Sequence, residues 1–236
     1  ERSRFRLTVF RTWAGDAVPV VFSLGDATVS AVAGETVTIT DLGGGSCRVE
    51  APSGTLEGPC RVDAVWDGWD AVPSVGLQVE GCSLPDWNAE GGVVYRPCQY
   101  ARGDLHVRPD NSAGLNLSVE IDIEDYLLGI SEMPYFWGEV GGAAALEAQV
   151  VAARSYALHR AIVRGDAEDR PWCACDIYDT TVDQFYAGWG HGQTSWINAV
   201  RATAGKVIYH PSSTWGGVQI PIEAFYSSST FGTTEN

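Results

Sequence analysis

The first half of the chain alternates short apolar and polar positions in a way that is typical of β-strands. Runs such as FRLTVF, VPVVFSL and ETVTITDL are rich in β-branched residues, and Gly, Asp, Pro and Ser interrupt them at short intervals. The pattern continues to about residue 115 and predicts antiparallel strands arranged as a sandwich or a barrel-like sheet. We therefore expect a β-rich N-terminal region over residues 1–115.

The pattern changes from residue 116 onward. LNLSVEIDIEDYLLGI passes from a strand into a short helix, and the Ala-rich stretch at residues 141–165 places apolar side chains at steps of three and four. That spacing predicts one long helix, which Gly165 ends. A further helix is expected at TSWINAVRAT, followed by strands at KVIYH and IPIEAFYSSS. The predicted class is α+β, with a mixed α/β region over residues 116–236 that we expect to be truncated at its C-terminal end.

The charge of the chain narrows the range of partners. The formal net charge is −15, which argues against binding to nucleic acid, because a phosphate backbone requires a basic surface. It also argues against adsorption to anionic membranes. No apolar run reaches the length of about 18 residues that a transmembrane helix needs, so none is predicted in this chain.

The cysteines indicate an oxidising compartment. Their number is even and no C-x-x-C spacing occurs, a pattern typical of a disulfide framework in a secreted protein. The alternative is that all of them are buried free thiols. Six cysteines allow 15 connectivities, and the one that pairs sequence neighbours would form the bonds Cys47–Cys60, Cys82–Cys98 and Cys173–Cys175.

Four motifs follow one another in the second half of the chain. They are EDYLLGISEMP at 124–134, ALEAQVVAARSYAL at 145–158, DTTVDQFYAG at 179–188, and AVRATAGKVIYH followed by IPIEAFYSSSTFGTTEN. In this order they resemble the SpoIID/LytB family, whose pattern runs YL-x-G-V-x-x-EMP, LKAQAVAARTYAL, DTT-x-x-Q-x-Y-x-G and A-x-Y-x-SSxGGxTEN. The resemblance covers about residues 112–236.

The resemblance implies peptidoglycan as the substrate and a secreted or cell-wall location. For the sporulation branch of the family it implies a lytic transglycosylase that cleaves MurNAc–GlcNAc linkages in glycan strands stripped of stem peptides, without a cofactor. The acid of that branch is the Glu of EMP, which is Glu132 here. The amidase-modifier branch implies instead a non-catalytic wall-binding protein that stimulates a separate amidase. A structural surface protein on the same fold is a third hypothesis.

The chemistry of glycan cleavage explains why one carboxyl group would suffice. The leaving oxygen needs a proton, and the sugar's own 6-hydroxyl can then attack in place of water. Such an acid must be protonated near neutral pH, which apolar surroundings favour. Glu132 has these neighbours in sequence, whereas the alternative is that it caps the following turn. Glu139 and Glu147 are rival carboxyl groups. The apolar neighbours of Glu132 are Ile130, Met133, Pro134, Tyr135, Phe136 and Trp137.

Polar and aromatic side chains in the other motifs are candidates for binding sugar hydroxyls. A helical arginine is equally typical of a salt bridge, and an Asp-Thr-Thr run is equally typical of a turn or helix cap. A serine nucleophile is not indicated, because no G-x-S-x-G pattern surrounds the serines. The candidates for substrate binding are Arg154, Tyr156, Asp179, Thr180, Gln184, Tyr186, Tyr226, Ser227 and Ser228.

The chain departs from the family pattern at two places. Where some sporulation-branch members carry the His-Cys of DTTHCQ, which implies zinc binding, this chain has Val182 and Asp183. We therefore predict no metal site. Phe231 stands where the family usually has Gly, and a bulky ring there would suit a groove that binds glycan without cleaving it.

Overall fold

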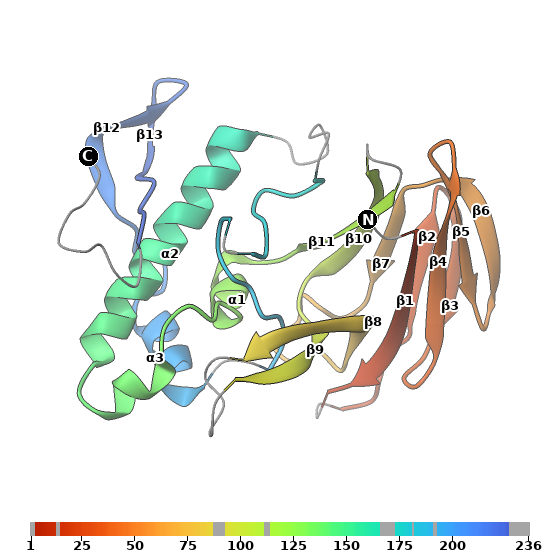
Figure 1. The fold of residues 1–236 in the computed structure, drawn as a ribbon, viewed down its shortest axis with the longest axis horizontal. Coiled ribbons are helices and arrows are strands. Elements are labelled where there is room, and N and C mark those ends of the chain that lie inside the picture. Colours follow the sequence, from red (N-terminus) through yellow and green to blue (C-terminus); the bar gives the residue numbers. More distant parts are fainter. Residues whose placement is uncertain are drawn as a thin grey trace.

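The computed structural model describes residues 3–12, 15–86, 93–110, 114–165, 173–180, 182–190 and 193–226. Among the described residues, eleven strands gather at one end of the molecule and the helices at the other, so that the predicted α+β class is confirmed (Figure 1). In the described part of the chain, no helix combines the length and the apolar character needed to cross a membrane.

Two antiparallel sheets form the β-rich part. One has the order β6-β5-β4-β1-β8-β9 and the other β11-β10-β7-β2-β3. Alternate side chains of each sheet enter one shared apolar core, as the burial of every second residue along β1 illustrates. The strands are β1 (Arg4–Arg11), β2 (Val20–Leu24), β3 (Ala27–Ala31), β4 (Thr36–Gly43), β5 (Ser46–Ala51), β6 (Gly54–Pro59), β7 (Val62–Val65), β8 (Val75–Asp86), β9 (Val94–Tyr100), β10 (Asp104–Asp110) and β11 (Gly114–Glu120).

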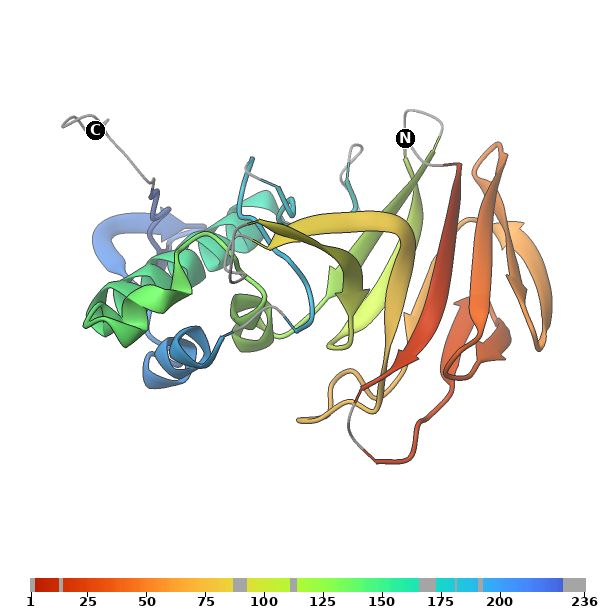
Figure 2. The same ribbon diagram turned by 60° about the horizontal axis from the view of Figure 1, so that its bottom comes forward.

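The outer parts of β8 and β9 form an arm toward the helical end of the molecule (Figure 2). The pairing of the two strands slips between Val79 and Ser83, and Gly81 there has a φ of 67°. Such a bulge bends a strand. The disulfide Cys82–Cys98 joins the two strands at this bend.

The second half contains the helices. They are α1 (Ile123–Leu128), the short 3₁₀ helix η1 (Tyr135–Glu139), α2 (Ala143–Arg164) and α3 (Thr194–Ala202), and the hairpin β12 (Tyr209–Trp215) and β13 (Val218–Pro221) follows. The long predicted helix is α2, and Gly165 is its C-cap with a φ of 72°. The strand expected at IPIEAFYSSS is regular only to Pro221, because the backbone that follows leaves the hairpin and runs along α2.

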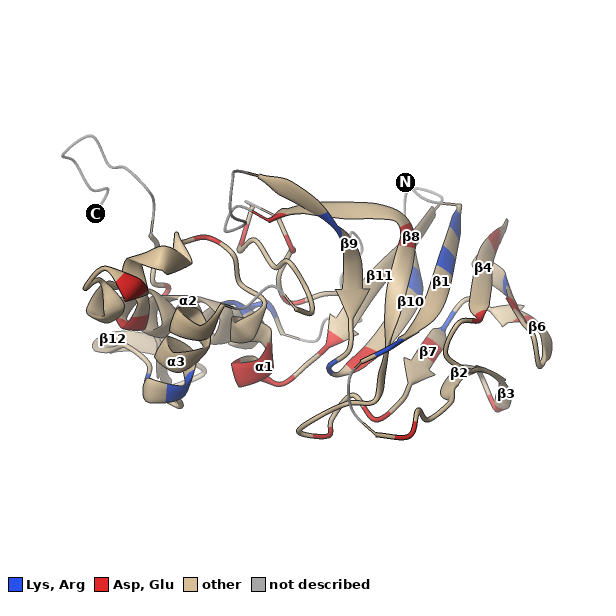
Figure 3. Cartoon of the chain, turned by 90° about the horizontal axis from the view of Figure 1, so that it is seen from below, with Lys and Arg blue, Asp and Glu red and all other residues tan. Residues whose placement is uncertain are grey.

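The predicted boundary at residue 115 falls at the start of β11. This strand pairs along its whole length with β10 and then leads directly into α1. The sheet therefore continues past the boundary, and the division into 1–115 and 116–236 stays a prediction. Figure 3 marks acidic positions of the ribbon in red in both parts of the chain.

Two of the three expected disulfides are present. Cys82–Cys98 and Cys173–Cys175 are bonded, whereas Cys47 and Cys60 are buried free thiols that contact each other. The prediction of a Cys47–Cys60 disulfide is therefore wrong. The reason is register: Gly58, and not Cys60, lies directly opposite Cys47 in the β5–β6 ladder.

Candidate functional site

A short backbone pairing brings the first and third motifs together. Ile130 and Tyr186 form an isolated antiparallel bridge, and the amide of Ala187 donates to the Gly129 carbonyl at 2.7 Å. A side chain at Gly129 would not fit, because an added Cβ would lie 2.3 Å from the Tyr186 ring. The pairing fixes the backbone that carries Glu132 against the third motif.

The carboxylate of Glu132 is held at both oxygens. The Phe185 amide donates to Oε1 at 3.1 Å, and the Tyr226 hydroxyl donates to Oε2. Burial raises the pKa of Glu132 above the usual range of a glutamate, although the bonds from Tyr226 and from the Phe185 amide act in the opposite direction. Glu132 is therefore a partly buried acid whose protonated form is favoured by its surroundings.

Gln184 organises the groups around this acid. It is fully buried, its Oε1 accepts from the Tyr126 hydroxyl at 3.0 Å, and its Nε2 donates to Tyr226 at 2.8 Å and to the Ala153 carbonyl at 3.2 Å. These bonds use both of its donors and its acceptor, so that Gln184 positions Tyr226. Tyr126 was not among the predicted residues, although the YL of the first motif could have indicated it.

Arg154 serves a different part of the fold. Its guanidinium is 1% exposed and binds Glu124 with two nitrogens, at 2.9 and 2.7 Å, and the Lys206 carbonyl with the third, at 3.0 Å. The salt-bridge alternative thus describes what the structure contains. Arg154 joins α2 to α1 and to the chain before β12.

Tyr156 belongs to a second buried cluster, centred on Asp183. Its hydroxyl donates to the Asp183 carboxylate at 2.8 Å, and Arg164 binds the same carboxylate at 2.7 and 2.8 Å. Burial raises the pKa of Asp183, but the bonds from Arg164, the Tyr178 amide and Tyr156 outweigh it and lower the pKa overall. Asp183 is therefore ionised and neutralised by arginine.

No metal cluster accompanies this carboxylate in the described part of the chain. The described residues contain no group of three or more His, Cys, Asp or Glu side chains arranged to hold an ion. Arg164 supplies the positive charge next to Asp183. The absence of a metal from the protein stays a prediction.

Among the described residues, Asp179, Thr180 and Tyr186 form no hydrogen bond with Glu132. Asp179 and Thr180 lie in an exposed turn, where Thr180 Oγ1 accepts from the Val182 amide at 3.3 Å. Tyr186 is buried, and its ring stacks on Tyr126 at a centroid distance of 5.2 Å. The two rings together form a wall next to the site. Ser227 and Ser228 lie outside the described residues, as does Phe231.

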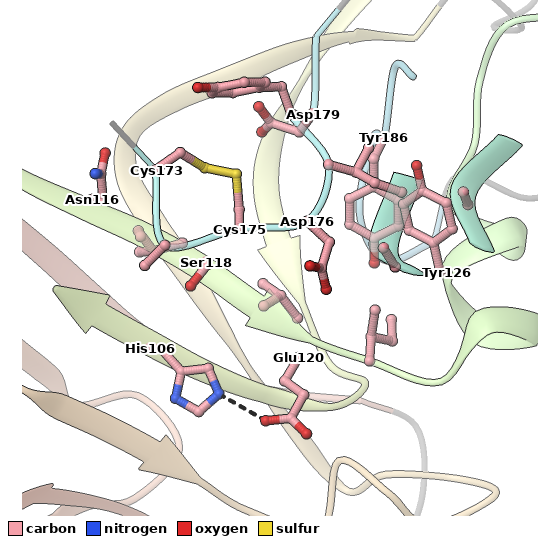
Figure 4. Close-up of a pocket in the computed structure, with 18 of the residues that line it drawn as sticks. His106, Asn116, Ser118, Glu120, Tyr126, Cys173, Cys175, Asp176, Asp179 and Tyr186 are labelled. Atoms are coloured by element: carbon pink, nitrogen blue, oxygen red, sulfur yellow. Dashed lines mark ion pairs between the residues drawn. A yellow bond between two sulfur atoms is a disulfide. The ribbon is translucent and has the colours of Figure 1, made fainter. Parts of the chain in front are cut away.

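A large cavity lies on the other side of this tyrosine wall. It has a volume of about 820 Å³, is partly open to solvent, and is lined by residues of β10, β11, α2 and the segment 173–179 (Figure 4). Asp176, Asp179 and Glu120 line it, whereas Glu132 does not. This cavity and the candidate acid are thus separate places.

The chain that follows Glu132 offers aromatic surface. Phe136 is 56% exposed and Trp137 is 39% exposed on η1, four and five residues after the acid. Exposed aromatic faces can pack against apolar faces of a ligand. Glu139, a rival carboxyl group, is exposed at the end of η1, and Glu147 is half-buried on α2.

Comparison with known proteins identifies part of the chain. Residues 111–210 match the family model SpoIID, described as stage II sporulation protein. No curated protein and no solved structure matches the chain. The matched range contains Glu132, Arg154 and Gln184, and it indicates a function related to sporulation or the cell wall.

Proposed function

We propose that this chain, which belongs to the SpoIID family, is a peptidoglycan lytic transglycosylase with Glu132 as its single general acid and base. The observation that carries the proposal is the carboxyl group of Glu132, partly buried, with a raised pKa and with a hydrogen bond to each oxygen. Its substrate would be MurNAc–GlcNAc linkages in strands without stem peptides.

The reaction would begin with protonated Glu132. The acid donates its proton to the glycosidic oxygen as the bond from that oxygen to C1 of MurNAc breaks, leaving an oxocarbenium-like sugar. The Glu132 carboxylate then removes the proton from the C6 hydroxyl of the same sugar while that oxygen bonds to C1. A 1,6-anhydro ring forms, and Glu132 is protonated again.

The neighbours of Glu132 suit this cycle. Hydrogen bonds to a carboxylate are stronger than those to a neutral carboxyl group. The bonds from Tyr226 and the Phe185 amide therefore stabilise the intermediate state, in which Glu132 has lost its proton. Burial has the opposite effect and is the larger influence, so the pKa of Glu132 is raised overall and its protonated form is favoured in the resting enzyme.

The proposal is tested by the product. Wild-type protein incubated with glycan strands lacking stem peptides is expected to produce 1,6-anhydro-MurNAc ends, detected by mass spectrometry. Ser118→Trp, which fills the separate cavity, is expected to leave this activity unchanged. If no such ends form at any pH while the protein still pellets with cell walls, the protein is not a transglycosylase.

The pH dependence provides a second prediction. Because the first step needs protonated Glu132, kcat/KM falls as pH rises through its raised pKa. Tyr226→Phe removes a bond that lowers this pKa, so the descending limb is expected to move to higher pH, with a lower maximal rate. Profiles of kcat/KM against pH for both proteins check this, and a shift to lower pH would contradict it.

A wall-binding protein that stimulates an amidase is the second candidate function. The β12–β13 hairpin favours it, because Tyr209, Trp215 and Val218 are exposed there and offer an apolar surface to another protein. Glu132→Gln protein added to a wall amidase would then still raise its rate. Either function places the chain outside the cytoplasm, and the two disulfides are compatible with that location.

A further inference from the structure

The segment 222–226 runs along one edge of α2. Arg160 forms an ion pair with Glu223 at 2.9 Å, and one turn earlier on the helix Tyr156 packs edge-on against Phe225, at a centroid distance of 6.0 Å. The segment therefore advances toward the N-terminal half of α2.

The next residue on this edge of α2, Ala153, is connected to Glu132 through hydrogen bonds. The Ala153 carbonyl accepts from Gln184, which holds Tyr226 against the acid. Gln149 is four residues before Ala153, and residues at this spacing lie one above the other on a helix. Gln149 thus occupies the position next along the edge.

The chain after Glu132 confirms where this position lies. It passes into η1, and Gly138 of η1 packs so closely on Leu146 that an added Cβ would be 2.9 Å from Leu146 Cδ1. Between Ala153 and Leu146 the chain from Glu132 to η1 therefore lies over α2. Gln149 lies between Leu146 and Ala153 along α2, and from these two contacts we place it on the side of the helix toward the segment that carries Glu132.

Gln149 is 9% exposed, yet its Nε2 has no hydrogen-bond partner among the described residues. A buried donor without an acceptor costs free energy, and most such groups in folded proteins are paired. Apolar side chains of similar size would avoid this cost. A ligand that supplies an oxygen would satisfy the donor at this position.

We infer that Gln149 is a substrate-positioning residue that donates its amide N–H to the acetamido carbonyl oxygen of an N-acetylated sugar held beside Glu132. The inference rests on the proposed function in taking a glycan as the ligand. A carbonyl oxygen accepts and cannot donate, which matches the unused donor. A sugar without the acetyl group carries an ammonium, which cannot accept, so Gln149 also makes the site selective for N-acetylated strands.

Binding to soluble oligosaccharides tests this residue. The probes are tetramers of N-acetylglucosamine and of glucosamine, titrated by calorimetry against Glu132→Gln protein, which does not cleave. Gln149→Met is expected to weaken binding of the N-acetylated tetramer by about tenfold, the effect of one lost hydrogen bond. Binding of the glucosamine tetramer is expected not to change. Gln219→Met, which alters an exposed amide on β13, is the matched control.

Thermal stability separates a ligand role from a structural one. Because Nε2 has no partner, Gln149→Met is expected to leave the melting temperature unchanged or to raise it. If Gln149 instead holds other parts of the protein, the melting temperature falls and both tetramers bind less well. That result overturns the inference, as does equal binding of the N-acetylated tetramer with and without Gln149, or no binding by the Glu132→Gln parent.

The two proposals can fail separately. Loss of selectivity in Gln149→Met, together with a wild-type protein that forms no anhydro ends, would support the inference and reject the transglycosylase. Anhydro ends formed by a wild-type protein, with tetramer binding indifferent to Gln149, would reject the inference alone.

Discussion

Glu132→Gln is expected to lower the rate of anhydro-product formation by about 10² to 10⁴-fold, the contribution typical of general acid–base catalysis. Gln has the shape of Glu, and its amide can still accept from the Phe185 amide and bond to Tyr226, so the site is expected to keep its structure. The variant lacks only the proton that the first step transfers. Initial rates on strands without stem peptides, measured at the optimal pH of the wild type, give the ratio.

The rival carboxyl groups provide the controls for this result. Glu139→Gln and Glu147→Gln remove the same charge from η1 and α2 and are expected to keep the wild-type rate, because neither contacts the network around Glu132 in the described structure. Unchanged binding of glycan by Glu132→Gln would show that the loss lies in the chemical step. A full rate in Glu132→Gln would assign the acid to another residue.

The sequence predicted elements better than contacts. Alternation and turn residues were enough for the strands, because they depend on which face of a sheet is buried. Helix α2 was predicted from its spacing of apolar residues and from Gly165. The bulge in β8, which aims the β8–β9 arm at the helices, left no clear pattern, since it depends on pairing between strands.

In the candidate site too, the sequence indicates residues but not the contacts between them. The motifs indicate Glu132, Gln184 and Tyr226 as candidates. Only the fold shows that the Tyr226 hydroxyl lies between the other two and bonds to both. A polar side chain in a motif looks alike in sequence whether it binds a ligand or another side chain. Arg154 and Tyr156 are candidates for substrate binding from the sequence, and the structure shows that their charged or hydroxyl groups are bonded inside the protein. Their role in binding a substrate stays a prediction.

Arg154→Met is expected to lower the free energy of unfolding by about 3 kcal/mol, at the lower end of the range for breaking a buried ion pair. The side chain is 1% exposed, so the variant loses its bonds to Glu124 and to the Lys206 carbonyl in a place that water reaches poorly. Glu124 is one-third exposed and can be partly rehydrated, which keeps the loss from being larger. Urea unfolding of both proteins measures the difference.

Two further variants show whether the pair itself carries this effect. Glu124→Gln in the Arg154→Met background removes the unpaired charge and is expected to restore part of the lost free energy, so the two changes are not additive. Arg201→Met, an exposed arginine on α3, is expected to change stability by no more than about 0.5 kcal/mol. If Arg154→Met unfolds like the wild type but no longer binds glycan, the guanidinium contacts the substrate, and the role predicted from the sequence is the correct one.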